Sequence, residues 1–145
     1  MISKRDRSRK LDAKLLEEIT EAALVELKIT EEELDIVLVG AKEMAAINQK
    51  YLHHEGPTDV ITFDYSERPA KGRLHGEIFI CLAEAGRQAK EFGTTWQAEL
   101  VRYVIHGILH LTGHDDLRPA ARKKMKLAEG RLLRKLSRRF PLSKL

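Results

Sequence analysis

The first half of the chain alternates between helical and extended spacing of its apolar residues. Residues 11–29 repeat leucine, isoleucine and alanine every three or four positions, which predicts a helix. Residues 30–40 hold a run of Leu, Ile and Val that ends in glycine, which predicts a strand, and helix-forming residues return over 41–52. Gly56 and Pro57 then break the pattern, because proline disfavours helix at the residue before it.

Two further strands are predicted in the second half. Residues 58–65 alternate Val, Thr and Asp with Ile, Phe and Tyr, and residues 75–83 form an apolar run. The loop over 67–74 is short, so these two strands are predicted to form a hairpin-like pair. The second strand is expected to lead directly into a helix over 84–93.

A long helix is predicted over 94–113. Thr95 is expected to cap its start, and Gly113 is suited to a left-handed cap at its end. Pro119 then opens a last helix, since proline is tolerated in a first helical turn. Strands mixed with helices predict an α+β fold. We expect a single small domain over 1–145, with a mixed sheet of about four strands packed with helices.

Composition narrows the class of protein. The chain has 145 residues, of which 43% are hydrophobic and 33% charged, as expected of one globular domain. Its apolar stretches fall short of the roughly 18 residues that would span a bilayer, so we expect no membrane contact. The single cysteine, Cys81, cannot form an internal disulfide, which is typical of a reducing compartment. We therefore expect a cytoplasmic protein.

Charge is distributed unevenly along the chain. Residues 1–10 carry five Lys/Arg and one Asp, residues 117–145 carry eleven Lys/Arg and one Glu, and the stretch between them is acidic. This pattern predicts a basic N-terminal arm over 1–10 and a basic helix over 118–140 that contact a polyanion, with nucleic acid the expected partner. The simpler alternative is that the basic helix only presents a solvated face.

The chemistry-bearing stretch is HGILHLTGHDD, residues 106–116, which holds three of the six histidines. His106 and His110 are four residues apart on the predicted helix, so their rings leave one face and can converge on one metal ion. Gly113 ends the helix and lets the chain fold back. Asp116, ten residues after His106, is then the expected third ligand.

Two histidines and a carboxylate leave one coordination position open, which is typical of a catalytic zinc site, although other divalent ions also suit imidazole. His114 is either an alternative ligand or a hydrogen-bond donor behind the ligands. The same spacing occurs in zinc peptidases, but these carry a glutamate general base where this chain has Gly107, so peptidase activity is disfavoured. A structural histidine pair without metal is the remaining alternative.

Together with GPTDVITF (56–63) and HGEIFIC (75–81), the histidine stretch resembles the YbeY family of bacterial endoribonucleases, the rRNA maturation factors. The resemblance runs from about Leu11 to the last helix. It implies a single-domain, zinc-dependent hydrolase with a zincin-like metal helix that cuts single-stranded RNA. It also implies a role in small-subunit rRNA maturation and ribosome quality control, with the small ribosomal subunit as partner and no DNA.

Two positions depart from the family pattern. The third metal ligand is usually a histidine, and its place is taken by Asp116, whose negative charge should make the metal a weaker Lewis acid. An arginine usually follows the tyrosine ahead of the Pro-Thr strand, and that position is Leu52, which cannot bind a phosphate. Lys50, His53 or His54 would then have to replace it.

The candidate catalytic residues are Thr58, Asp59 and Glu77. Thr58 and Asp59 follow the Gly-Pro turn and are expected to line the groove beside the metal, although turn chemistry explains them equally well. Glu77 is a candidate base behind the metal ligands, although a carboxylate on an edge strand without this role is an equal alternative. The ion would either activate water for attack on a phosphodiester or polarise the phosphate while the RNA 2′-hydroxyl attacks. The alternative function is a ribosome-assembly or RNA-binding factor with a structural metal and little cleavage.

Overall fold

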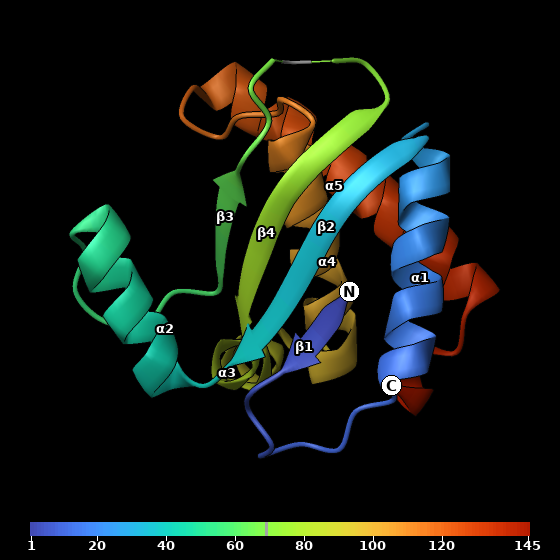
Figure 1. Ribbon diagram of the computed structural model, residues 1–145. Coiled ribbons are helices and arrows are strands. Elements are labelled where there is room, and N and C mark those ends of the chain that lie inside the picture. Colours follow the sequence, from blue (N-terminus) through green and yellow to red (C-terminus); the bar gives the residue numbers. More distant parts are fainter. Residues whose placement is uncertain (69) are drawn as a thin grey trace.

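Four strands form one mixed sheet in the computed structural model, which describes residues 1–68 and 70–145 (Figure 1). Across the sheet the order is β1 (Ile2–Lys4), β2 (Glu31–Val39), β4 (Arg73–Cys81) and β3 (Val60–Asp64). The first three strands are parallel, and β3 runs antiparallel to β4. The predicted α+β class, the four-stranded mixed sheet and the hairpin-like link are therefore confirmed.

The edge strand β1 is not predicted by the sequence pattern. Ile2 pairs with Ile36 and Lys4 with Leu38, so part of the basic segment 1–10 lies in the sheet. Its three residues are too few to show a period, and their partner strand is far along the chain. Arg9, further along the same segment, places its guanidinium 5.2 Å from the centre of the Trp96 ring.

The predicted helices are all present. They are α1 (Ala13–Glu26), α2 (Ala41–Ile47) with the π-helical turn Asn48–Leu52 that continues it, α3 (Leu82–Phe92), α4 (Trp96–Leu111) and α5 (Pro119–Arg139). Several boundaries differ from the predicted ones by one to three residues, and the strand expected over 75–83 begins at Arg73 and ends at Cys81. Leu82 and Ala83 already belong to α3. None of the helices in the described ranges is long and apolar enough to cross a membrane.

The two faces of the sheet pack against different helices. The larger core lies between one face and the helices α1, α4 and α5, and a smaller cluster forms on the other face with α2 (Figure 1). Along β4 the side chains alternate accordingly: Ile78 and Ile80 enter the larger core, whereas Phe79 and Cys81 enter the smaller one. This alternation decides which β4 residues can reach the histidine-bearing helix α4.

Candidate metal centre

The helix α4 carries both predicted histidine ligands and is held rigidly. The hydroxyl of Thr95 accepts a hydrogen bond from the backbone N–H of Ala98 at 3.2 Å, so the predicted N-terminal cap is confirmed. Ile105, Ile108 and the other apolar residues of α4 are buried against the sheet. The imidazoles leave the remaining face in its last two turns and stay partly exposed, which keeps them accessible to a ligand.

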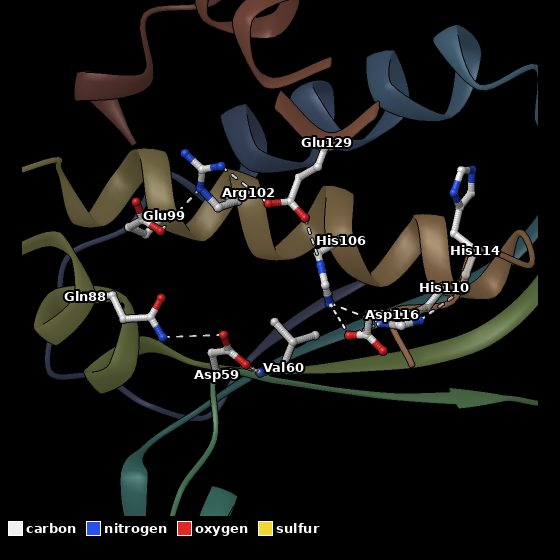
Figure 2. Close-up of polar contacts among 10 residues, drawn as sticks. All are labelled: Asp59, Val60, Gln88, Glu99, Arg102, His106, His110, His114, Asp116 and Glu129. Carbon is white, nitrogen blue, oxygen red and sulfur yellow. Dashed lines mark hydrogen bonds and ion pairs between the residues drawn. The ribbon is translucent and has the colours of Figure 1, made fainter. Parts of the chain in front are cut away.

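The side chains of His106, His110 and Asp116 converge on one point (Figure 2). The two Nε2 atoms are 3.1 Å apart, and Oδ2 of Asp116 lies 3.5 Å from Nε2 of His110 and 3.9 Å from Nε2 of His106. Ligands at ordinary zinc bond lengths in a tetrahedron are about 3.3 Å apart. The three atoms therefore have the spacing that a tetrahedral divalent ion requires.

The turn after α4 brings Asp116 to the histidines. Gly113 adopts φ of +103°, its N–H donates to the His110 carbonyl, and the His114 N–H donates to the Leu109 carbonyl. This pair of bonds is the Schellman motif, and its left-handed residue is normally glycine. The chain reverses there, which confirms the predicted C-terminal cap and places Asp116 beside His106 and His110.

The outer nitrogen of each imidazole is hydrogen-bonded, which fixes its tautomer. Nδ1 of His110 lies 3.1 Å from the backbone carbonyl oxygen of His114, and Nδ1 of His106 lies 2.8 Å from Oε2 of Glu129. Both oxygens are acceptors, so each Nδ1 carries the hydrogen and each neutral ring directs its Nε2 lone pair inward. Two lone pairs facing each other at 3.1 Å repel unless a cation lies between them. The donor set therefore fits a metal ion.

Glu129 contacts His106 in this site, and the sequence pattern did not predict it. It lies on α5, is 7% exposed, and belongs to a chain of ion pairs in which Arg102 contacts both Glu99 at 3.5 Å and Glu129 at 3.4 Å (Figure 2). Burial alone would lower the pKa of His106, but the hydrogen bond and charge of Glu129, with the charges of Asp59 and Asp116, raise it above its usual value. A buried carboxylate behind a metal-binding histidine orients the ring and increases its basicity.

A signal for Glu129 exists in the sequence. It is the one acidic residue between 117 and 145, and it shares the buried face of α5 with Met125, Leu132 and Leu136. A carboxylate at an apolar position of a basic helix needs a buried partner. The partner itself is not readable from the spacing, because His106 lies 23 residues earlier.

His114 does not join the ligand atoms. Its side chain points away from the convergence point in Figure 2, and only its backbone carbonyl takes part, as the acceptor for His110. Burial, followed by the nearby charges of Lys124 and His110, lowers the pKa of its imidazole. The His114 side chain is therefore neither a third ligand nor a hydrogen-bond donor behind the ligands. Instead, the backbone carbonyl of His114 accepts a hydrogen bond from His110.

The predicted catalytic residues occupy different places. Asp59 lines the same cavity as His106 and Asp116, and its carboxylate accepts from the Val60 N–H at 2.8 Å and from Nε2 of Gln88 at 3.4 Å. Thr58 precedes it and donates its hydroxyl to Asp59 at 3.4 Å. The structure therefore brings Asp59 to the metal centre, with Thr58 as its neighbour.

Glu77 lies elsewhere. It alternates with Ile78 along β4, and Ile78 contacts α4, so the Glu77 side chain leaves the opposite face of the sheet. There its carboxylate accepts a hydrogen bond from the Tyr65 hydroxyl at 2.9 Å. The structure does not bring Glu77 to the histidines, because the sheet itself stands between them. Leu52 is 44% exposed at the end of the π-helical turn and does not line the cavity beside His106.

Gly107 explains why the peptidase glutamate is missing. A Cβ atom at this position would lie 2.7 Å from Cδ1 and 2.8 Å from Cγ2 of Ile78 on β4. The residue after the first histidine therefore points into the sheet, where only glycine fits. A general base at position 107 could not reach the ligands, which agrees with the expectation that peptidase activity is disfavoured.

An α+β domain that presents two histidines and a carboxylate beside a cavity is typical of metal-dependent hydrolases. A profile of the family described as Endoribonuclease YbeY matches residues 1–137. The chain belongs to this family, as its resemblance in sequence implied.

Individual relatives agree with the family match. An Endoribonuclease YbeY of Salinibacter ruber is 35% identical over 132 residues, which cover 87% of this chain and 84% of the relative. One of Myxococcus xanthus is 39% identical over 125 residues, which cover 83% of this chain and 42% of the relative. The solution structure of TM1509 from Thermotoga maritima superposes with a TM-score of 0.66 at 30% identity, and covers 94% of this chain and 89% of that one.

Proposed function

We propose that this chain is a zinc-dependent endoribonuclease that cuts single-stranded RNA in the cytoplasm. Its proposed work is the maturation of small-subunit rRNA and ribosome quality control, on RNA held by the small ribosomal subunit. Residues 1–145 act as one hydrolase domain, and the basic stretches 1–10 and 118–140 contact the RNA backbone. Support comes from the family, whose relatives are named endoribonucleases, and from the convergence of His106, His110 and Asp116.

The observation that carries the proposal is the orientation of the two imidazoles. Their Nδ1 atoms are held by Glu129 and by the His114 carbonyl, so both Nε2 lone pairs face the same point. The two Nε2 atoms lie 3.5 and 3.9 Å from Oδ2 of Asp116. A metal ion at such a site supplies Lewis acidity for phosphodiester hydrolysis. Two histidines and one carboxylate leave a coordination position open to substrate, which distinguishes a catalytic site from a closed structural one.

Asp59 is the group best placed to handle a proton beside this site. Its carboxylate is fixed by the Val60 N–H and by Gln88, and it lines the cavity that also contains His106 and Asp116. In the proposed reaction Asp59 accepts the proton of the attacking hydroxyl group, whether that group is water or the RNA 2′-hydroxyl.

The proposal is tested with a fluorescently labelled single-stranded RNA and the matching duplex. The zinc-loaded protein should cut the single strand and leave the duplex largely intact. His110→Ala, purified in the same way, should lose this cleavage. His75→Ala removes an exposed histidine on the other face of the sheet and should cut like the parent protein. Equal cleavage by the parent and His110→Ala would overturn the proposal.

A second candidate, an RNA-binding assembly factor with a structural metal, is favoured by one observation. Leu52 stands exposed where the family usually has arginine, and a leucine cannot bind a phosphate. On this account the protein binds single-stranded RNA and zinc but leaves the labelled RNA uncut, and His110→Ala changes the zinc content alone.

A further inference from the structure

A cavity lies beside the ligands and is lined by His106 and Asp116 among other residues. It has a volume of about 460 Å³, which is within the range of about 300–1,000 Å³ that small-molecule sites occupy. Helix α4 supplies its central residues, including Arg102 and His106, between side chains from α3 on one side and α5 on the other (Figure 2). The space is therefore continuous with the metal centre and can hold a ligand that also reaches it.

Two cations on the α5 side of this cavity lack anionic partners. Arg122 and Lys126 are one turn apart on α5 and both line the cavity, and neither forms an ion pair with any residue in 1–68 or 70–145. The carboxylates around them are already engaged. Arg102 neutralises Glu99 and Glu129, and Asp116 faces the histidines. The two free cations are thus available to an anion that comes from outside.

The α3 side of the cavity presents an aromatic ring. Phe92, the last residue of α3, lines the cavity yet is 65% exposed. Its ring is accessible from the cavity, and a phenylalanine ring is a stacking platform for a nucleobase. One side of the cavity therefore suits a base, and the other suits a phosphate.

We propose that this cavity is a nucleotide subsite in which Phe92 stacks on the base and Arg122 and Lys126 bind the phosphate of the RNA unit next to the scissile bond. This inference rests on the proposed endoribonuclease function and specifies where its substrate lies.

Binding of a single nucleotide tests the subsite without relying on cleavage. The zinc-loaded protein is titrated with uridine 5′-monophosphate, and separately with inorganic phosphate, while NMR shifts are followed. Replacing both cations, Arg122→Gln with Lys126→Gln, should weaken uridine monophosphate binding about tenfold or more. Hydrogen bonds between a cationic side chain and a phosphate are stronger than those between neutral groups. Phe92→Leu should weaken the nucleotide several-fold and leave inorganic phosphate unchanged.

The matched control is Lys14→Gln with Lys90→Gln. Both residues are exposed, on α1 and α3, neither lines the cavity or belongs to the basic stretches, and the change in net charge is the same. This double variant should bind uridine monophosphate like the parent protein. Equal weakening in both double variants would overturn the subsite, because it would show only a general effect of charge. An unchanged affinity in Phe92→Leu would overturn the assignment of a base-stacking side.

The RNA cleavage assay separates this inference from the function on which it rests. In one outcome the parent protein cuts single-stranded RNA, while replacement of Arg122, Lys126 and Phe92 leaves its affinity for the nucleotide unchanged. In that case the subsite proposal is wrong and the proposed nuclease function is retained. If those residues control nucleotide binding and no RNA is cut, the subsite stands and the nuclease proposal is wrong.

Discussion

The Nδ1 atom of His106 on α4 lies 2.8 Å from the Oε2 atom of Glu129 on α5, where the imidazole is partly exposed and the carboxylate is nearly buried. This contact ties the metal-binding face of one helix to the buried face of another. The otherwise basic helix α5 thereby places one negative charge next to the Nδ1 atom of a metal-binding imidazole. The position and the tautomer of His106 both depend on that charge.

Glu129→Gln should weaken zinc binding by about 10- to 100-fold, since loss of a partner behind a metal ligand typically has an effect of this size. The amide keeps an acceptor for Nδ1 but loses the charge. The affinity is measured by competition with a zinc chelator. Glu26→Gln is the matched control, because Glu26 also pairs with a residue of α5, Lys135, at 2.7 Å but far from the ligands. An unaltered zinc affinity in Glu129→Gln would show that Glu129 does not support zinc binding through His106.

The stability of the metal-free protein should depend on pH through the same contact. Burial lowers the pKa of His106, but the hydrogen bond and charge of Glu129, with the charges of Asp59 and Asp116, raise it in the folded protein above the ordinary value of 6.5. The stabilisation is therefore fully present below pH 6.5 and is lost as the pH rises through the raised pKa. The difference in Tm between the parent and Glu129→Gln should be largest near about pH 6 and should shrink toward about pH 9. Thermal melts of the two metal-free proteins across this range measure it, and a difference that grows with pH would contradict this account.

Much of this centre was predictable because its main features are local in sequence. The spacing of His106 and His110 and the glycine turn at Gly113 give a helix, two ligands on one face and a return of the chain toward Asp116. Periodicity also gave the helices and the paired strands. These features depend on neighbours within about one or two turns, which sequence spacing describes well.

The rest depends on contacts between distant segments. Strand β1 exists because Ile2 meets Ile36 across the sheet, and Glu129 matters because α5 packs beside α4. Glu77 fails to reach the histidines because its side chain leaves the face of β4 opposite to Ile78. From Ile78 onward β4 is buried on both faces, and such an apolar run does not tell which residues face α4. Sequence spacing can predict metal ligands that lie on one helix. The residues that hydrogen-bond to those ligands are determined by how the helices pack.

Gly107→Ala should destabilise the protein by about 1–3 kcal/mol, as overpacking of a close contact usually does. The added Cβ would lie 2.7 Å from Ile78, and α4 would have to move away from β4. Urea unfolding of the zinc-loaded protein measures the loss, and zinc affinity should fall with it. In an Ile78→Ala background the penalty should largely disappear, because all three crowding atoms are then absent.

The control for Gly107 is another helical glycine. At Gly130 on α5 a Cβ would meet only the end of the flexible Arg134 side chain, at 3.2 Å. Gly130→Ala should therefore raise stability by up to about 1 kcal/mol through helix propensity. Destabilisation of similar size at both positions would show that the close contact with Ile78 is not the cause.

Asp59→Asn should lower kcat for cleavage of single-stranded RNA by about 100-fold or more, the usual contribution of a positioned acid–base group, while zinc content stays unchanged. Glu77→Gln is the matched control, since it makes the same chemical change on the other face of the sheet and should retain full activity. If Glu77→Gln were the inactive variant and Asp59→Asn the active one, the placement of the catalytic carboxylate would be wrong.

The metal centre itself is tested most directly by counting zinc. Mass spectrometry is applied to protein purified without a metal-affinity tag, beside Asp116→Ala and Asp115→Ala. Asp115 is the exposed neighbour whose carboxylate accepts from the Leu117 N–H instead of facing the histidines, so its variant controls for the loss of one acidic side chain. We predict one zinc ion per chain in the parent and in Asp115→Ala, and a sharp loss in Asp116→Ala. Zinc retained by Asp116→Ala, or absent from the parent after zinc is added back, would contradict a site built from His106, His110 and Asp116.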